Sequence, residues 1–172
     1  MIVPARVRWA VDVLDPGPDE HLLEAGCGPG VAAALVCARL HTGRLLAVDR
    51  SATAVARTTR RNAEHLAAGR LAVAECALDE LTVPPGSLDQ AFTINVNLFW
   101  VRDPGRELSV LRTALRPGGR LHVLYGADGP TGAATVTPAV AAALATHGFV
   151  GVEELTGPGG IGVSTRTPGS RS

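Results

Sequence analysis

The sequence predicts an α/β domain with a mostly parallel, doubly wound sheet of seven strands that ends in an antiparallel hairpin. Short apolar runs alternate with longer segments of helical period along the 172 residues, which is typical of a parallel sheet with helices on both faces. The last two runs are joined by a turn too short for a crossover, so they pair antiparallel. This length suits a single domain. We expect the domain to span residues 1–167 and residues 168–172 to form a frayed tail.

Seven runs carry the strand pattern, and turn residues separate them. Pro84, Pro85 and Gly86 precede the fourth run, and residues 157–160 form the final turn. The expected strands are residues 21–25, 44–49, 71–76, 88–96, 120–125, 149–156 and 161–167.

Helical segments lie between these strands, and capping and helix-stopping residues mark their ends. Residues 31–40 are apolar nearly all round, which predicts a well-covered helix. A second helix runs from its N-cap Ser51 to about residue 67 and ends before Gly69. A third begins at residues 103–104 and stops at 117–119, and a fourth begins at 137–138 and ends at 148.

Composition argues against several classes of protein. The formal net charge is zero, so we do not expect the concentrated basic surface that nucleic-acid binding requires. No apolar stretch is long enough to span a membrane, and the first residues lack the pattern of a signal peptide. The three cysteines show no CxxC spacing, which favours a reducing, cytoplasmic setting. Histidines and carboxylates lack metal-ligand spacing, so we predict no metal site.

The exit of the first strand carries the residues that point to a ligand. Glu24 is followed by Gly26, Gly28 and Gly30, and glycines let a turn bring backbone N–H groups close to a ligand. Asp49 ends the second strand, where an acid can accept hydrogen bonds from both hydroxyls of a ribose. A glycine turn followed by such an acid predicts a cofactor that contains a nucleoside.

The spacing of the glycines and the charge of Glu24 indicate which cofactor it is. The dinucleotide fingerprint places its third glycine where this chain has Val31, whereas the third glycine here is Gly30. A carboxylate at position 24 would repel a pyrophosphate but suits a cofactor with an ammonium and a sulfonium group. The pattern therefore favours S-adenosylmethionine over NAD or FAD.

Four stretches in order, residues 22–30, 47–51, 88–100 and 115–123, resemble the motifs of class I S-adenosylmethionine-dependent methyltransferases. The resemblance covers almost the whole chain and implies a Rossmann-like fold. It implies a cofactor site made of Glu24, Gly26, Cys27, Gly28, Asp49, Arg50, Cys76, Ala77 and Asn95.

One position departs from the family pattern. Where the family commonly has an aspartate for the adenine amino group, this chain has Cys76 and Ala77. Either the backbone of these two residues serves the adenine, or Asp79 or Glu75 replaces the aspartate.

The acceptor side is predicted from the residues that follow the fourth and fifth strands. We expect Asn97, Trp100 and Tyr125 to line the acceptor pocket, with Tyr125 and His122 as candidate catalytic bases. A hydrogen-bonded core histidine is the competing interpretation of His122. Little chain is available to cover the site, so we expect a shallow cleft that a second subunit, as in a homodimer, or a large acceptor completes.

Three hypotheses of function follow. The first is in-line methyl transfer to a small-molecule substrate, for which few catalytic side chains are needed. The second is a protein that binds S-adenosylmethionine without transferring methyl, either a regulator or a cofactor-assisted enzyme. The third is nucleic-acid methylation, which is disfavoured because residues 95–100 lack an Asn-Pro-Pro-aromatic loop.

Overall fold

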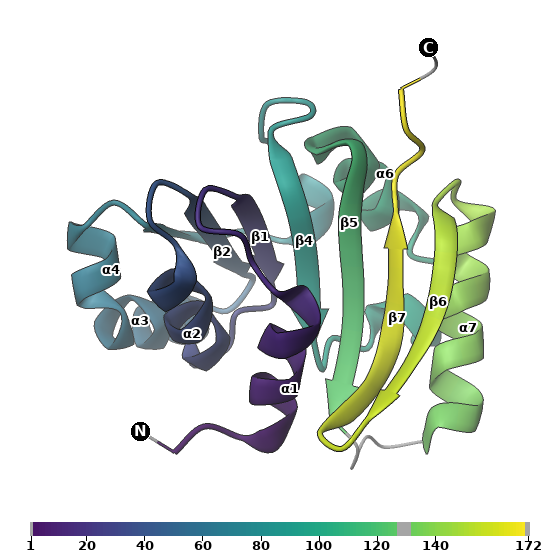
Figure 1. The fold of residues 1–172 in the computed structure, drawn as a ribbon, viewed down its shortest axis with the longest axis horizontal. Coiled ribbons are helices and arrows are strands. Elements are labelled where there is room, and N and C mark those ends of the chain that lie inside the picture. The colour runs from purple at the N-terminus through teal and green to yellow at the C-terminus, as the bar shows by residue number, and fades with distance from the viewer. Residues whose placement is uncertain (1, 127–131, 171–172) are drawn as a thin grey trace.

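A seven-stranded sheet in the order β3-β2-β1-β4-β5-β7-β6 forms the centre of the molecule. The computed structural model describes residues 2–126 and 132–170. Strands β1 to β5 are parallel, and β7 lies antiparallel between β5 and β6. The predicted fold class, including the terminal antiparallel hairpin, is confirmed (Figure 1).

The strand order reverses between β1 and β4, so the carboxyl ends of these two neighbours flank a crevice at the edge of the sheet. The strands are β1 His21–Ala25, β2 Arg44–Asp49, β3 Leu71–Glu75, β4 Leu88–Ile94, β5 Leu115–Gly126, β6 Val150–Gly157 and β7 Gly160–Arg166.

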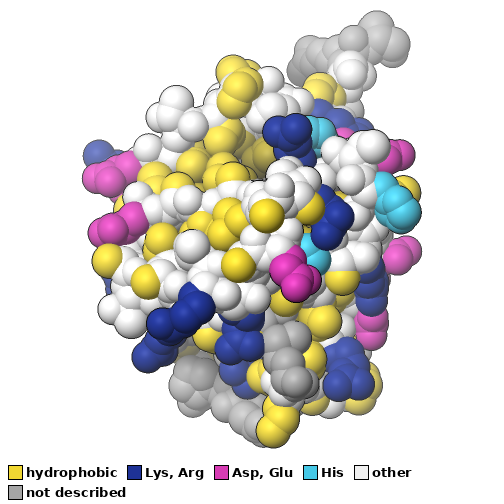
Figure 2. All heavy atoms as spheres, turned by 90° about the vertical axis from the view of Figure 1, so that its left-hand side faces the viewer, with side chains coloured by type: hydrophobic (Ala, Val, Ile, Leu, Met, Phe, Trp, Pro, Cys, Tyr) yellow, Lys and Arg dark blue, Asp and Glu magenta, His cyan; other side chains and the backbone are white. Residues whose placement is uncertain are grey.

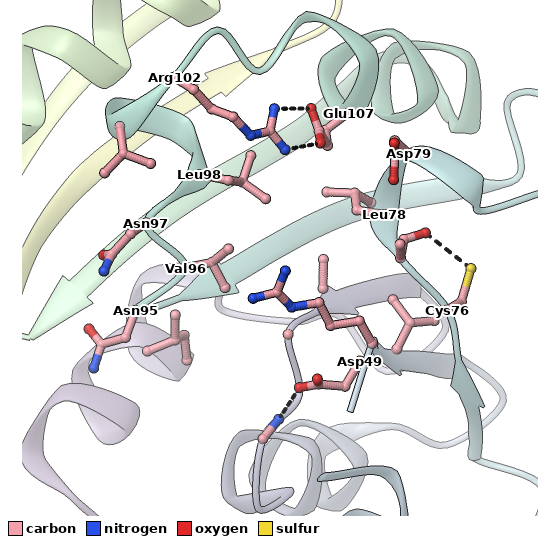
Figure 3. A pocket seen from close by; sticks show the side chains of 18 residues that line it. Asp49, Cys76, Leu78, Asp79, Asn95, Val96, Asn97, Leu98, Arg102 and Glu107 are labelled. Carbon is pink, nitrogen blue, oxygen red and sulfur yellow. Dashed lines mark hydrogen bonds and ion pairs between the residues drawn. The ribbon is translucent and has the colours of Figure 1, made fainter. Parts of the chain in front are cut away.

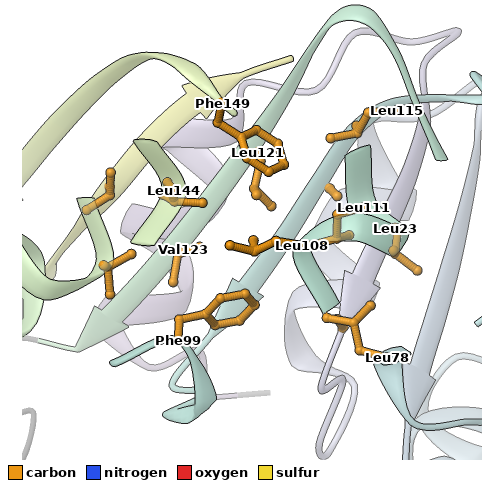
Figure 4. Packing of buried hydrophobic residues seen from close by; sticks show 14 of the residues in the cluster. Leu23, Leu78, Phe99, Leu108, Leu111, Leu115, Leu121, Val123, Leu144 and Phe149 are labelled. Atoms are coloured by element: carbon orange, nitrogen blue, oxygen red, sulfur yellow. The ribbon is translucent and has the colours of Figure 1, made fainter. Parts of the chain in front are cut away.

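Helices cover both faces of the sheet, because successive strand residues point to opposite sides. Leu22 packs with α1 and α2 on one face, and Leu23 packs with α6 and α7 on the other (Figure 4). The helices are α1 Ala5–Leu14, α2 Val31–Arg39, α3 Ala52–Arg61, α4 Ala63–Ala67, the short 3-10 turn η1 Leu78–Glu80, α5 Leu98–Val101, α6 Gly105–Ala114 and α7 Gly132–Thr146.

Strand β3 forms one edge of the sheet and carries no helix of regular length after it, only η1. Figure 2 shows this side of the molecule, where arginine and acidic side chains are interspersed and hydrophobic side chains surface between them. Within the described residues, no helix is long and apolar enough to cross a membrane.

Several predicted boundaries are wrong. The single helix expected to about residue 67 is two helices, α3 and α4, and the strand expected over 88–96 ends at Ile94. Leu115 pairs with Leu88 as the first residue of β5, so the helix before it ends at Ala114 rather than at the Pro-Gly-Gly sequence. The next helix begins at Gly132, and Pro138 lies inside it instead of at its start. In the expected tail, Pro168 accepts a hydrogen bond from Gly118 N at 3.2 Å, and residues 171–172 lie outside the described residues.

Helix α1 was not predicted. It buries Val7, Ala10, Val11 and Leu14, and its Trp9 lies against the turn between β6 and β7. A Cβ atom on Gly157 would come within 2.2 Å of Trp9 Nε1, so glycine permits this contact. The segment 6–9 thus belongs to a helix that packs on the C-terminal hairpin.

Candidate active site

A cleft of about 700 Å³ opens at the carboxyl ends of β1, β2, β3 and β4 (Figure 3). Most of the residues predicted to bind the cofactor come together there. The predicted residues that line the cleft are Gly26, Gly28, Asp49, Arg50, Cys76, Ala77, Asn95 and Asn97.

The glycine turn after β1 lies directly against the exit of β4. Gly26 has a φ of 80°, and a Cβ atom there would come within 2.6 Å of Val96 Cγ2. Gly28, with a φ of 52°, has open space where a side chain would lie. Both positions therefore need glycine, and the turn presents bare backbone to the cleft.

Asp49 is held in a fixed orientation by two backbone donors. Its Oδ2 accepts from Gly28 N at 3.0 Å and its Oδ1 accepts from Ser51 N at 2.9 Å. Each carboxylate oxygen has a further lone pair, so the side chain can also accept the two hydroxyls of a ribose. Ser51, as predicted, caps α3 by accepting from Ala54 N.

Helix α3 binds the other side of the glycine turn, which sequence analysis missed. Thr58 Oγ1 donates to Gly28 O at 3.0 Å, Asn62 Nδ2 donates to Gly30 O at 3.0 Å, and Arg61 Nε donates to Pro29 O at 2.7 Å. Thr58 and Asn62 are buried. Their spacing of four residues, which places both on one helix face, was the available signal.

Glu24 lies beneath the glycine turn, 2% exposed, and does not reach the cleft surface. Burial, and then the charge of Asp49, raise the pKa of its carboxyl well above the usual range. Its Oε2 has no hydrogen-bond partner among the described residues. A buried carboxylate without a donor is costly, so the site is suited to a cation.

At the β3 end of the cleft, Cys76, Ala77 and Asp79 line the wall, whereas Glu75 does not. The Cys76 thiol donates to Ala77 O at 3.1 Å. Asp79 Oδ2 lies 3.9 Å from Arg106 Nη1. Of the alternatives for adenine, the structure leaves the 76–77 backbone and Asp79 at the cleft.

The opposite wall is formed by the segment after β4. Asn95 has a φ of 60°, and its Oδ1 accepts from Gly126 N at 2.9 Å. Asn97 Oδ1 accepts from Trp100 Nε1 at 3.3 Å. Both asparagines line the cleft, while Trp100 itself does not.

An ion pair that sequence analysis also missed closes this wall. Arg102 donates from Nη2 to Glu107 Oε1 at 2.5 Å and from Nη1 to Glu107 Oε2 at 3.2 Å. The hydrogen bond from Arg102 is the main reason why the pKa of the buried Glu107 is lowered. Both residues line the cleft.

The structure does not bring the two candidate bases to the cleft. Tyr125 is 3% exposed and donates to Val96 O at 2.8 Å, and burial raises the pKa of its phenol. His122 is 4% exposed and lies between Ser164 Oγ at 2.7 Å and Gln90 Oε1 at 3.2 Å. Burial lowers its pKa to about 4. His122 matches the competing interpretation, a hydrogen-bonded core histidine.

Cys27 lies inside the glycine turn rather than on the cleft wall. It is buried, its Sγ accepts from Thr58 Oγ1 at 3.4 Å, and burial raises the pKa of its thiol to about 11. Its side chain therefore packs beneath the turn. Among the described residues, no group of three or more histidine, cysteine or acidic side chains could hold a metal ion.

Comparison with known sequences identifies the family. The model of a methyltransferase domain family matches residues 22–119, more than half of the chain. An uncharacterized 37.1 kDa protein in transposon TN4556 of Streptomyces fradiae is 38% identical over 112 residues, which cover 64% of this chain and 31% of that protein. An uncharacterized Synechococcus protein is 32% identical over 108 residues, which cover 63% of this chain and 26% of that protein. The chain thus spans about a third or less of these curated relatives.

Solved structures share the fold at low sequence identity. An S-adenosylmethionine-dependent O-methyltransferase from Thermotoga maritima has a TM-score of 0.77 and 15% identity, covering 100% of this chain and 68% of its own. The [4+2]-cyclase SpnF has a TM-score of 0.75 and 16% identity, and the match covers 95% of this chain and 80% of SpnF. Geranyl diphosphate C-methyltransferase from Streptomyces coelicolor A3(2) has a TM-score of 0.72 and 16% identity, and the match covers 94% of this chain and 78% of that enzyme. The chain belongs to a methyltransferase domain family, and it has the fold of S-adenosylmethionine-dependent methyltransferases, as its four motifs predicted.

Proposed function

We propose that the protein transfers a methyl group from S-adenosylmethionine to a small-molecule acceptor. The observation that carries the proposal is the cleft itself. One wall holds the glycine turn and an oriented Asp49. The other wall is formed by residues 95–102, of which only Asn95 is expected to contact the cofactor. One cleft thus offers room for a cofactor and for a second molecule.

The residues present fit the cofactor at three places. Asp49 is oriented to accept the ribose hydroxyls. Arg50, the backbone of residues 76–77 and Asp79 surround the end that suits the adenine. The uncovered backbone at Gly28 allows the methionine portion to approach closely.

Glu24 supports the choice of a cofactor that carries an ammonium group. Its unpaired Oε2 is buried next to the glycine turn, and an ammonium group there would neutralise the carboxylate. A pyrophosphate would instead add negative charge beside Glu24 and Asp49. Glu24 therefore favours S-adenosylmethionine and disfavours a dinucleotide, whereas Asp49 suits the ribose of either cofactor.

When bound, the cofactor supplies a methyl group on a sulfonium, and transfer leaves the electrons of the broken C–S bond on sulfur while an acceptor lone pair forms the new bond. The chain contributes alignment, because both walls fix their partners before reaction. Asp49 and the glycine turn set the position of the donor. Residues 95–102 set the position of the acceptor.

Three features support a small molecule as the acceptor. The cleft has the size of a ligand pocket, and the charge of the chain is balanced. One protein of similar fold is named for geranyl diphosphate, and an N-methyltransferase from Haemonchus contortus was solved in complex with phosphomonomethylethanolamine. Val101, 59% exposed at the cleft, leaves an apolar surface for the acceptor or a second subunit to cover.

The three free cysteines are consistent with a cytoplasmic setting.

Formation of S-adenosylhomocysteine tests the proposal. Purified protein is incubated with S-adenosylmethionine labelled in the methyl group and with a small-molecule extract of cells, and the product and the labelled acceptor are identified by mass spectrometry. We expect label in a small molecule with the wild type and a strong loss with Asp49→Ala. Cofactor binding without any product would favour the non-methylating alternative, and label transferred to added nucleic acid would overturn the small-molecule assignment.

A further inference from the structure

We propose that the ion pair between Arg102 and Glu107 positions the acceptor segment, residues 97–102, so that methyl transfer depends on this pair whereas cofactor binding does not. The inference rests on the proposed function and names two positioning residues for it. Neither residue lies in any of the four stretches that resemble the family motifs.

The backbone of the acceptor segment is not bonded to any other element. Its helix α5 has four residues, a single turn that is not stable without tertiary contacts. The backbone N–H groups of Trp100 and Val101 both donate to Asn97 O at 3.2 Å, inside the segment. Among the residues that the structure describes, no backbone group of 97–102 bonds to another strand or helix. Side chains must therefore hold the segment in place.

The first two residues of the same wall are held differently. Asn95 N donates to Leu124 O at 2.9 Å, and Val96 O accepts from the Tyr125 hydroxyl at 2.8 Å. Strand β5 thus fixes the part of the wall that lies against the glycine turn. This part keeps its position without any contribution from Arg102.

Side chains connect the acceptor segment to the rest of the protein at its middle and at its end. Phe99, 1% exposed, anchors α5 in the core. Arg102 directly follows α5, and Figure 3 shows its guanidinium facing the carboxylate of Glu107 on α6. The next residue, Asp103, pairs with His147, but its side chain is 78% exposed, and exposed pairs contribute little. Arg102 and Glu107 are therefore the main contact at the end of the segment.

The pair of Arg102 and Glu107 is better fixed than an ordinary surface ion pair. The side chain of Glu107 is 3% exposed and that of Arg102 is 52% exposed. Both carboxylate oxygens accept from the guanidinium, at 2.5 and 3.2 Å, and a bidentate pair has a defined geometry. Removing the partner of a buried charge is strongly unfavourable, so the folded protein keeps Arg102 at Glu107.

The position of the segment matters because it carries apolar side chains to the cleft. Leu98 and Val101 line the cleft, and under the proposed function they contact the acceptor. A misplacement of about 1 Å can slow a reaction about 100-fold. The cofactor is instead held by Asp49 and the glycine turn, which is bound from behind by α3. Loss of the ion pair should therefore slow transfer and leave cofactor affinity unchanged.

Two variants of the half-exposed Arg102 test this separation. Arg102→Met keeps an unbranched side chain without the charge, and Arg102→Lys keeps the charge without the bidentate geometry. The initial rate of label transfer is measured with saturating methyl-labelled S-adenosylmethionine and the small-molecule extract, and the Kd for S-adenosylhomocysteine is measured by calorimetry. We expect the rate to fall about tenfold or more in Arg102→Met and less in Arg102→Lys. The Kd should stay the same in both variants.

Amide hydrogen exchange, followed by NMR in the S-adenosylhomocysteine complex, reports on the segment without any turnover. The amides of Trp100 and Val101 should exchange faster in Arg102→Met and at an intermediate rate in Arg102→Lys. The amide of Asn95, which is bonded to β5, should not change. Arg116→Met is the matched control. It removes a 49% exposed arginine that pairs with Asp89 at the start of β4, far from the cleft, and should alter neither exchange nor rate.

The outcomes separate this inference from the proposed function. Unchanged exchange at Trp100 and Val101 in Arg102→Met, or an unchanged rate of transfer, would overturn the positioning role. If the Kd for S-adenosylhomocysteine rises as much as the rate falls, the pair serves the cofactor and the inference is wrong. If the wild type binds S-adenosylhomocysteine but labels no acceptor, the proposed function fails and takes the role in transfer with it, whatever the exchange rates are.

Discussion

Individual side chains in this protein are oriented by backbone groups that only a folded loop provides. Asp49 illustrates this, because Gly28 N and Ser51 N fix its two oxygens from opposite sides. Glu24, one strand away, has an oxygen without a partner. An oriented acid and an unpaired acid side by side fit a ligand that brings both hydroxyl groups and a positive charge.

Replacing Asp49 tests the first of these acids. Asp49→Ala should weaken S-adenosylhomocysteine binding by about 1–3 kcal/mol, the scale of lost hydrogen bonds to a charged acceptor, which is a roughly five- to 150-fold rise in Kd. Titration calorimetry measures the change. Asp12→Ala removes an exposed acid of α1 that pairs with Arg39 of α2. This control variant should leave Kd unaltered. An unchanged Kd in folded Asp49→Ala would remove Asp49 from the site.

Glu24 should make cofactor binding depend on pH. The pKa of Glu24 is raised in the free protein, and a bound ammonium group would favour the ionised form and lower that pKa again. Binding of S-adenosylhomocysteine should then release a proton, so affinity should rise as pH rises toward the raised pKa and level off above it. Calorimetry in buffers of different ionisation enthalpy counts the proton.

Glu24→Gln is the matched control, because glutamine keeps the size and removes the titration. It should bind more weakly at neutral pH and show no proton release. Proton release that persists in this variant would assign the effect to another group.

The two candidate bases are the predicted site residues that lie buried, away from the cleft. Tyr125 ends β5 at the correct rim, but it shares a face with Leu121 and Val123 and is buried with them. His122 points to the other face and binds Gln90 and Ser164, which lie 32 and 42 residues away in the chain. The alternation of a strand can be predicted from sequence, whereas its distant partners cannot.

At the scale of whole elements, α3 turns the glycine loop into a fixed structure. Its side chains bind the carbonyls of three consecutive loop residues, while the Gly28 N–H donates to Asp49 on the cleft side of the loop. The helix thereby acts on the cofactor site without touching it. Thr58 and Asn62 are positioning residues in this sense.

Removing one hydroxyl from α3 tests that role. Thr58→Val keeps the shape but leaves Gly28 O without its donor, and a hydrogen bond contributes about 0.5–1.5 kcal/mol. We expect a roughly two- to tenfold rise in the Kd for S-adenosylhomocysteine, and Thr58→Ser should restore binding. Thr113→Val removes a hydroxyl from the exposed face of α6. This control variant should leave the Kd for S-adenosylhomocysteine unchanged. A failure of serine to rescue would indicate that valine disturbs packing instead.

Elements were predictable where local pattern decides them. The parallel strands were found because apolar runs and their glycine or acid exits are local signals. The end of α6 was missed because Leu115 is drawn into β5 by pairing with Leu88, a distant partner. Helix α1 was missed although Val7, Ala10, Val11 and Leu14 follow helical spacing and were open to prediction.

For the molecule as a whole, the cofactor site joins the ends of four neighbouring strands and the segments that follow them. The cleft is formed by the ends of β1, β2, β3 and β4 together with the segment before α6. A ligand that contacts all of them binds the folded state alone. Unfolding must then release it, so binding raises the free energy of unfolding.

The size of this stabilisation and its selectivity form the last prediction. At a free concentration of about 100 times its Kd, S-adenosylhomocysteine should raise the free energy of unfolding by about 2.7 kcal/mol, seen as a higher Tm in thermal unfolding. NAD at the same concentration should give no shift, because its pyrophosphate would add negative charge next to Glu24, whose unpaired oxygen suits an ammonium group instead. In Asp49→Ala, the shift should return when the ligand concentration is raised in proportion to Kd. Stabilisation by NAD, or none by S-adenosylhomocysteine, would contradict the role assigned to Glu24, because a charge that favours an ammonium group must disfavour a pyrophosphate.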